Sequence, residues 1–156
     1  IEGNVAYITL TKGREAVIDA DNVPLVAGYN WRLGKGGYAI RSYRSCGKQF
    51  VVYMHREIIN CQPGYEVDHV DGDGTNNRKE NLRAATKAQN AYNVGPRANN
   101  TSGFKGVTFF KPMRKWRSMI MANGKRHYLG YFATPDEAAA AYAQASAALH
   151  GEYGRM

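Results

Sequence analysis

Residues 94–103, with the sequence VGPRANNTSG, separate two stretches of different character in this chain. The segment is rich in Gly, Pro, Asn and Ser and has no hydrophobic periodicity, which is typical of a linker. At 156 residues the chain is long enough for one ordinary domain or two small ones. The segment therefore favours two small units, residues 1–93 and residues 103–156, with a linker at 94–102.

The C-terminal unit has the pattern of three β-strands. The candidates are FKGVTFF, KWRSMIMA and KRHYLGYF, and the last two are joined by Asn123-Gly124, the strongest short hairpin signal. Alternation puts Trp116 on one face of the middle strand and Arg117 on the other. We expect the tryptophan face to meet a helix and the arginine face to stay open.

A helix is predicted after these strands. The sequence TPDEAAAAYAQASAALHG has Thr134 as the N-cap, Glu137 three residues later to complete a capping box, and Gly151 at the end. The residues expected to pack on the sheet are Ala139, Tyr142 and Ser146. Three antiparallel strands and one helix make a complete small unit.

Residues 1–93 begin with a β-rich block. Strands are predicted for VAYITL near the start, for GGYAIRSYR at 36–44 and for KQFVVYMH at 48–55. The last two alternate and are expected to form a hairpin, and a short helix fits within 19–31. A further helix should begin at Lys87, because the preceding Thr and the following Gln89 form a second capping box.

The stretch DHVDGDGTNNRKE allows two interpretations. As an EF-hand calcium loop with Gly74 at position six, it places Asp71 and Asp73 at positions three and five and Glu80 at position twelve. His69 then stands where the first carboxylate belongs, and EVDHV alternates like a strand where an EF-hand needs a helix. The calcium interpretation is therefore less favoured, and a solvated turn explains these acidic residues better.

The same stretch carries the groups that phosphodiester hydrolysis needs. Asp68 can hold a hard divalent cation, and a neutral His69 can take a proton from water near pH 7. Gly72 and Gly74 are expected to bend the chain and bring both side chains toward one site. A second metal ligand has to come from the helix opposite, where Asn90 stands in the first or second turn.

Residues 67–93 resemble the HNH nuclease family, which carries a D-H pair, a central N-L-R and a helical Asn or His in a ββα-metal unit. Here these are Asp68-His69, Asn81-Leu82-Arg83 and Asn90. The resemblance implies that His69 is the general base and that Asp68 and Asn90 bind one Mg²⁺ or Mn²⁺. It also implies that Asn81 ties the loop together so that the histidine is oriented.

The preceding YMHRE, with His55 and Arg56, matches homing-endonuclease members of that family. This match extends the resemblance upstream and puts the ββα-metal core at residues 50–93. His55 is open to two interpretations, a phosphate contact or a strand-end histidine. The resemblance also implies a phage-like or mobile-element origin.

Residues 102–156 resemble the AP2 DNA-binding domain. The matching stretches are GFKGV, KW, YLGYF and DEAA, followed by Ala-Tyr and a terminal Gly. In that family the three-stranded sheet lies in the major groove and the helix backs it. The residues expected to contact DNA are Lys105, Arg114, Lys115, Arg117, Arg126 and Tyr128.

Charge and composition restrict the partners. The net charge is +8, and residues 94–156 hold 9 Lys and Arg against 3 Asp and Glu, whereas residues 1–93 hold 12 against 10. Such an excess points to a polyanion, with nucleic acid before an anionic membrane and a basic surface kept for solubility as the alternative. Charge alone does not exclude RNA.

No apolar run approaches the roughly 20 residues that span a bilayer. Cys46 and Cys61 lack the spacing of a zinc site. We therefore expect a soluble, intracellular and cytoplasmic protein with free thiols and with neither a membrane nor a small-molecule substrate as its partner.

The predicted fold class is α+β: a small β-rich region running into a ββα-metal HNH unit, then a three-stranded antiparallel AP2-like sheet packed on one helix. The predicted function is a site-specific endonuclease that cuts double-stranded DNA with one divalent metal and a histidine base. The alternative is a non-catalytic DNA-binding regulator that keeps the HNH fold as a scaffold, against which the presence of Asp68, His69 and Asn90 argues. Monomer and dimer, and nicking and double-strand cutting, are open alternatives.

Overall fold

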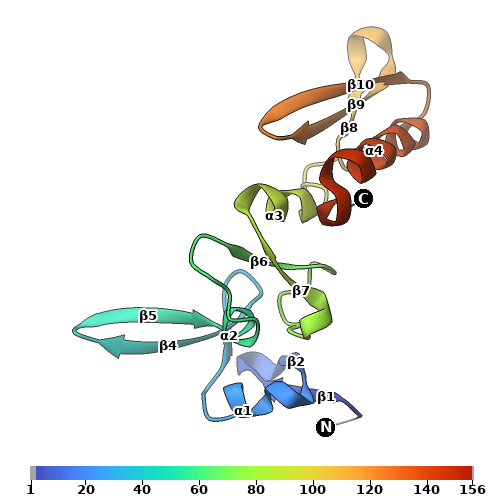
Figure 1. Cartoon of the computed structure of the whole chain (residues 1–156). Coiled ribbons are helices and arrows are strands. Elements are labelled where there is room, and N and C mark those ends of the chain that lie inside the picture. The colour runs from blue at the N-terminus through green and yellow to red at the C-terminus, as the bar shows by residue number, and fades with distance from the viewer. Residues whose placement is uncertain (1–2, 156) are drawn as a thin grey trace. The chain divides into compact units, whose positions relative to one another are not determined.

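The computed structural model describes residues 3–155 and combines helices with several small β-sheets (Figure 1). The chain divides between Lys87 and Ala88 into two compact units. Across residues 3–155, none of the helices has the length and apolar character that crossing a membrane requires. Cys46 is exposed and Cys61 half-buried, and both are free thiols, as predicted.

The N-terminal unit contains three small antiparallel sheets, β1-β2, β3-β4-β5 and β6-β7. Its strands and α-helices are β1 (Val5–Thr9), β2 (Glu15–Asp19), α1 (Val23–Val26), β3 (Arg32–Leu33), β4 (Ala39–Ser45), β5 (Lys48–Tyr53), α2 (Met54–Ile58), β6 (Glu66–His69) and β7 (Leu82–Ala85). Single 3-10 turns lie at Thr11–Gly13, Ala20–Asn22 and Lys79–Asn81. No element predicted from the sequence corresponds to β2, β3 or α2.

Helix α2 corrects the strand predicted for residues 48–55. The strand ends at Tyr53, and Met54 and His55 belong to the helix. The reason is burial, because Met54, His55 and Ile58 all turn into the interior, at a spacing that a helix allows and an alternating strand does not. The strand-end interpretation of His55 is therefore wrong.

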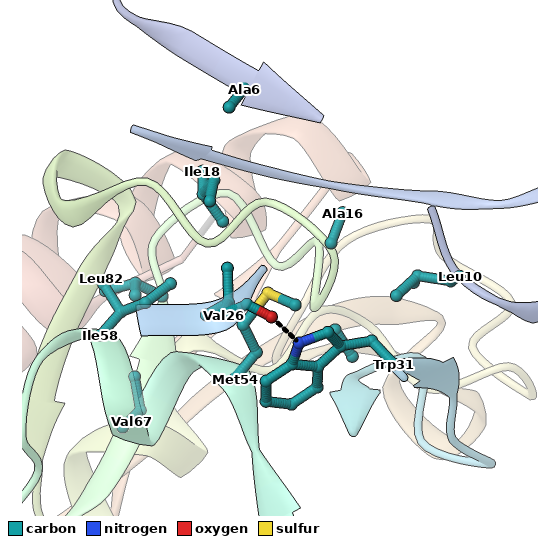
Figure 2. Packing of buried hydrophobic residues seen from close by; sticks show 11 residues of the cluster. Ala6, Leu10, Ala16, Ile18, Val26, Trp31, Met54, Ile58, Val67 and Leu82 are labelled. Atoms are coloured by element: carbon teal, nitrogen blue, oxygen red, sulfur yellow. Dashed lines mark hydrogen bonds between the residues drawn. The ribbon is translucent and has the colours of Figure 1, made fainter. Parts of the chain in front are cut away.

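One cluster of buried side chains holds the N-terminal unit together (Figure 2). Ile18, Val26 and Met54 are among its most deeply buried members, and the indole Nε1 of Trp31 donates a 2.9 Å hydrogen bond to the Val26 carbonyl. The cluster includes residues of β1, β2, α1, α2, β6 and β7. The strand pair that carries the Asp-His motif is thus fixed by the same core as the N-terminal hairpin.

The C-terminal unit contains an antiparallel sheet in the order β10-β9-β8. Its elements are α3 (Lys87–Asn93), which starts at the boundary between the units, β8 (Val107–Phe110), β9 (Lys115–Ala122), β10 (Lys125–Phe132) and α4 (Pro135–His150), with a 3-10 turn at Lys111–Met113 and another at Gly151–Tyr153. Asn123 and Gly124 have φ values of 51° and 73°. Two successive positive φ values are what a two-residue type I′ hairpin needs.

Helix α4 covers one face of this sheet. Its predicted capping box is confirmed: the Thr134 hydroxyl accepts from the Glu137 amide, and the Glu137 carboxylate accepts from the Thr134 amide. On the sheet, Ser118 and Ile120 are buried, as the prediction for the tryptophan face requires. The buried stripe of the helix differs from the predicted one, because it begins at Ala138 rather than Ala139; its members are Ala138, Tyr142, Ser146 and His150.

Helix α3 packs within the C-terminal unit through Tyr92. The Tyr92 ring stacks on His150 at 3.8 Å between centroids, its hydroxyl accepts from the Asn123 amide, and its carbonyl accepts from the Lys105 ammonium. These contacts explain why the chain divides before α3, whereas the predicted boundary follows it at residue 93. His150 is a structural histidine, since its Nε2 also lies 2.7 Å from the Met121 carbonyl.

Gly106 provides a test of how tightly α4 packs on the sheet. Its φ is +72°, and a Cβ there would collide with the Tyr142 ring and the Met119 carbonyl, whereas Gly103 has φ +78° and open space around it. We expect Gly103→Ala to cost about 1 kcal/mol through backbone strain alone. Gly106→Ala should cost about 2 kcal/mol more, because the helix has to move.

The measurement is amide hydrogen exchange in β9 of the full chain, which reports the stability of the C-terminal unit separately from the other unit. Gly103→Ala is the matched control for the positive φ. Equal destabilisation by the two substitutions would contradict the close packing of Tyr142 on Gly106.

Candidate active site

His69 ends strand β6 and points toward the interior of the N-terminal unit. In the β6-β7 ladder His69 pairs with Leu82 and Asp68 pairs with Arg83. Both residues lie in regular strand, where successive side chains point to opposite faces. The sequence predicts a bend that brings the Asp68 and His69 side chains to one side, and the regular ladder contradicts it. Gly72, at φ 77°, turns the loop that follows instead.

The imidazole of His69 is oriented by Asn77, a residue that is completely buried. Asn77 Nδ2 donates to the Thr75 carbonyl at 3.1 Å, so its Oδ1 is the end that lies 3.2 Å from His69 Nε2. An amide oxygen only accepts, and Nε2 must therefore carry the proton. This tautomer puts the basic lone pair of His69 on Nδ1.

The surroundings keep His69 neutral. Burial lowers its pKa below the ordinary histidine value, and the hydrogen bond with Asn77 and the nearby carboxylates of Asp71, Asp68 and Asp73 offset this effect only in part. A neutral imidazole is the form that can accept a proton. The side chain is therefore in the state of a base at pH 7.

A second histidine lies against the first. The ring of His55 is 5.0 Å from that of His69, and Tyr38 lies 5.2 Å from His55 and 5.6 Å from His69. The Tyr53 ring is the fourth member of this group, and its centroid lies 5.3 Å from that of His55. Burial, with the charges of His69 and Arg56, lowers the pKa of His55 to about 3. His55 is therefore a neutral part of the wall beside His69.

The acidic loop after β6 is held by its own side chains. Asp71 Oδ1 accepts from the Asp73 amide at 2.8 Å and from Asn81 Nδ2 at 2.9 Å, and Asn81 Nδ2 also reaches the Asn76 carbonyl. Burial by itself would raise the pKa of Asp71, but the hydrogen bonds from Asp73, Asn76 and Asn81 and the His69 charge bring it below its usual value. The Asn81 side chain thus ties the loop, as expected.

This geometry overturns the calcium interpretation. Strand β6 leads into the loop where an EF-hand has a helix, and the carboxylates of Asp71 and Asp73 accept hydrogen bonds from within the loop. Glu80 pairs with Arg78 at 2.6 Å. The glycine proposed for loop position six has another role, because a Cβ on Gly74 would lie 2.6 Å from the Tyr38 ring. The close approach of Tyr38 is what requires a glycine there.

Strand β2 fixes the loop from outside. The Val17 amide donates to the Thr75 carbonyl at 2.9 Å, and the Asn77 amide donates to the Val17 carbonyl at 2.7 Å. Asp19 adds two contacts, to the Lys79 amide at 2.8 Å and to the Arg78 guanidinium at 3.3 Å. The position of Asn77, and through it that of His69, therefore depends on the N-terminal hairpin.

Asp68, the predicted metal ligand of β6, forms an ion pair. Its Oδ2 lies 2.6 Å from Arg83 Nη2 and 2.8 Å from Nε, and the residue is only 3% exposed. Asn90, the second predicted ligand, belongs to α3 in the other unit. Their joint role at a metal therefore stays a prediction. Among residues 3–155 no group of three or more His, Cys, Asp and Glu side chains is arranged to hold a metal.

The predicted DNA-contacting residues lie in three places. In the ladder Arg126 pairs with Met121, Tyr128 with Met119 and Tyr131 with Arg117, so Arg117, Arg126 and Tyr128 share the face of the sheet opposite the buried Ser118 and Ile120. Arg114 and Lys115 are exposed at the start of β9. Lys105 differs, because it is half-buried and its ammonium donates to the Tyr92 carbonyl.

A sequence model of the HNH endonuclease family matches residues 60–92, which include β6, β7 and most of α3. An uncharacterized HNH endonuclease, L560, of Acanthamoeba polyphaga mimivirus is 32% identical over 155 residues, 96% of this chain and 80% of that protein. The chain belongs to the HNH endonuclease family.

Other relatives match parts of the chain. Protein 3.8 of Escherichia phage T7 is 36% identical over 95 residues, 60% of this chain and 76% of that protein. The AP2-like ethylene-responsive transcription factor TOE2 of Arabidopsis thaliana is 42% identical over 57 residues, 36% of this chain and 12% of that protein. No solved structure matches the chain.

Two residues beside His69 have weak signals in the sequence. Asn77 is one of two successive asparagines after a glycine-rich turn, a place where asparagine commonly binds backbone groups. Tyr38 stands about thirty residues before the motif, and only the fold brings it to the two histidines. His55 belongs to the YMHRE match, but its contact with His69 follows from α2.

The buried state of His55 predicts a pH dependence of stability. The unfolded chain binds a proton at the ordinary histidine pKa of about 6.5, whereas folded His55 does so only at about 3. The free energy of unfolding should therefore fall as the pH is lowered from 6.5 toward 3, by up to about 1.4 kcal/mol per pH unit from this group.

Urea unfolding of the wild type and of His55→Phe across this pH range measures the effect. The variant should lose stability less steeply, since phenylalanine fills the aromatic site without titrating. His127→Phe at an exposed position is the matched control. Parallel curves for the wild type and His55→Phe would contradict a buried neutral His55.

Proposed function

We propose that this protein is a DNA endonuclease that hydrolyses phosphodiester bonds with His69 as the general base and one divalent cation. The observation that carries the proposal is the orientation of a neutral His69 by Asn77 at the end of strand β6, where Asp68 is its neighbour in sequence. Membership of the HNH endonuclease family supports nuclease activity.

The donor chemistry of Asp68 and Asn90 fits Mg²⁺ or Mn²⁺. Carboxylate and amide oxygens are ligands of hard cations, and Mg²⁺ commonly keeps several waters and takes one or two carboxylates together with substrate phosphates. A cluster of three acidic residues is therefore not required. Asp68 would hold the ion, which when bound supplies positive charge against the scissile phosphate and the leaving 3′ oxygen, and Asn90 stays the second predicted ligand.

The residues of this chain have separate tasks in the proposed reaction. His69 accepts the proton of the attacking water at Nδ1, and Asn77 stabilises the resulting imidazolium by accepting from Nε2–H. Arg83 pairs with the Asp68 carboxylate and fixes its place in the strand pair. Asn81 keeps the loop closed through Asp71 and the Asn76 carbonyl, so that Asn77 stays beside the base.

We also propose that the open face of the β10-β9-β8 sheet binds double-stranded DNA and directs the cutting. The support is the presence of Arg117, Arg126 and Tyr128 on one face, the excess of base over acid in residues 94–156, and the similarity to an AP2-like transcription factor. A binding module joined to a cutter raises the effective concentration of the cutter at the site.

The first test of cutting compares the wild type with His69→Ala on supercoiled and linear DNA, with Mg²⁺ or Mn²⁺ against EDTA. Loss of a general base should lower the rate about 10²–10⁴-fold while DNA binding persists. The control is His127→Ala, a histidine exposed on the other unit. Binding without metal-dependent cutting by the wild type, on a DNA pool rich enough to contain a target, would favour the regulator.

A second test concerns the C-terminal sheet. Arg126→Gln on the open face should weaken DNA binding and lower the slope of log affinity against log salt by about one, because one phosphate contact is lost. Lys125→Gln is the matched control, as it removes the same charge from the neighbouring residue, whose side chain points to the opposite face. Equal losses of DNA affinity in Arg126→Gln and Lys125→Gln would contradict DNA binding by this face.

A further inference from the structure

The β4-β5 hairpin extends beyond the core of the N-terminal unit (Figure 1). Its ladder runs from the Ile40–Tyr53 pair to the Ser45–Lys48 pair, and every residue from Ser42 to Val51 is exposed. A projecting two-stranded ribbon with open faces contributes little to its own stability. Its length and exposure therefore require an explanation other than core packing.

One face of this hairpin continues into the candidate active site. Cross-strand partners share a face and successive residues alternate, so the pairs Ser42–Val51, Arg44–Gln49 and Ile40–Tyr53 lie together. The site-side face is defined here by Ser42, Arg44, Gln49, Val51 and Tyr53. The centroid of the Tyr53 ring lies 5.3 Å from that of His55, and the His55 ring lies 5.0 Å from that of His69. The site-side face therefore leads directly to the proposed base.

Strand β3 widens the same face. Arg32 pairs with Ile40 in the β3-β4 ladder, and its guanidinium donates to the Ser42 hydroxyl at 3.2 Å. Arg32 and Arg44 are both exposed and thus put two guanidinium groups on the site-side face. The opposite face has different chemistry: Tyr43 stacks on Phe50 at 5.3 Å, and Lys48 is its exposed cation.

The charge of the hairpin region is unlike that of the rest of its unit. Residues 31–55 contain five Lys and Arg and no Asp or Glu, whereas the other residues up to 93 contain seven Lys and Arg and ten Asp and Glu. The positive charge of the N-terminal unit is thus concentrated on β3, β4, β5 and the turns between them. This charge favours a polyanion as the partner of the region.

We propose that the site-side face of the β4-β5 hairpin binds the phosphate backbone of double-stranded DNA next to the bond that is cut. This inference rests on the proposed nuclease function and adds the surface that holds the substrate at its active site. A two-stranded β-ribbon fits the major groove of B-DNA. Arginine contacts phosphates, and serine and glutamine contact phosphates or base edges.

The ladder sets where the contact falls. Gln49, the partner of Arg44, stands four positions before Tyr53, which is about 14 Å of strand. With about 3.4 Å of helix axis per nucleotide, Arg44 reaches a phosphate roughly four base pairs further from the cut than Tyr53 does. The hairpin therefore holds the duplex on one side of the active site.

The test compares Arg44→Glu with Lys48→Glu in the full chain. Both reverse one exposed charge of the same hairpin, on opposite faces. Binding to a labelled 30-base-pair duplex DNA is measured in EDTA over a range of salt, so that no cutting is needed for the readout. We expect Arg44→Glu to weaken binding about tenfold or more and to lower the salt slope by about one, with Lys48→Glu close to the wild type.

The outcomes separate this inference from the nuclease proposal. The assignment of the site-side face would be overturned if Arg44→Glu bound DNA with the affinity and salt slope of the wild type. It would also be overturned if Arg44→Glu and Lys48→Glu lost equal amounts of affinity. Equal or tighter binding to a duplex RNA, with the same dependence on Arg44, would assign the face to RNA and overturn it as well. If the expected pattern appears but the wild type cuts no DNA in Mg²⁺ or Mn²⁺, the hairpin surface stands and the nuclease proposal fails.

Discussion

The site depends on a backbone connection between Val17 of β2 and the loop after β6. The Val17 amide donates to the Thr75 carbonyl, and the Val17 carbonyl accepts from the Asn77 amide. These two bonds attach the loop to the edge of the N-terminal hairpin. Asn77 in turn fixes His69 through Nε2. A histidine can act as a base only if its tautomer and direction are held, and this connection holds both. The first strands of the chain are therefore part of the catalytic apparatus that we propose.

The surroundings of His69 combine opposing electrostatic effects. The aromatic wall of Tyr38, Tyr53 and His55 removes water and disfavours a charged imidazole, while the acidic loop favours it. Burial outweighs the carboxylates, since the loop uses those groups as acceptors for its own amides. The same acidic residues that resemble a calcium loop in the sequence thus serve to shape a turn, and the histidine stays neutral beside them.

Local patterns in the C-terminal unit were sufficient to predict its elements. The Asn123-Gly124 turn, the alternation of β9 and the capping box at Thr134 each act over a few residues, and the structure contains all of them. The buried stripe of α4 contains the predicted Tyr142 and Ser146 but begins at Ala138 rather than Ala139, because contact with the sheet and not the alanine pattern decides which residues are covered. Helix α2 was not predicted for a related reason. The run KQFVVYMH has the pattern of a strand along its whole length, and only the burial of Met54 and His55 makes its last two residues helical.

The sequence by itself determined the chemistry: the Asp68-His69 pair, the loop asparagines and the basic segments are short-range features whose residue types limit what they can do. Only the tertiary structure decided their arrangement. It placed Asp68 against Arg83, Asn77 against His69 and His55 beside His69, because these contacts join residues of different elements and loops. Such contacts arise from strand pairing and core packing, which no local pattern encodes.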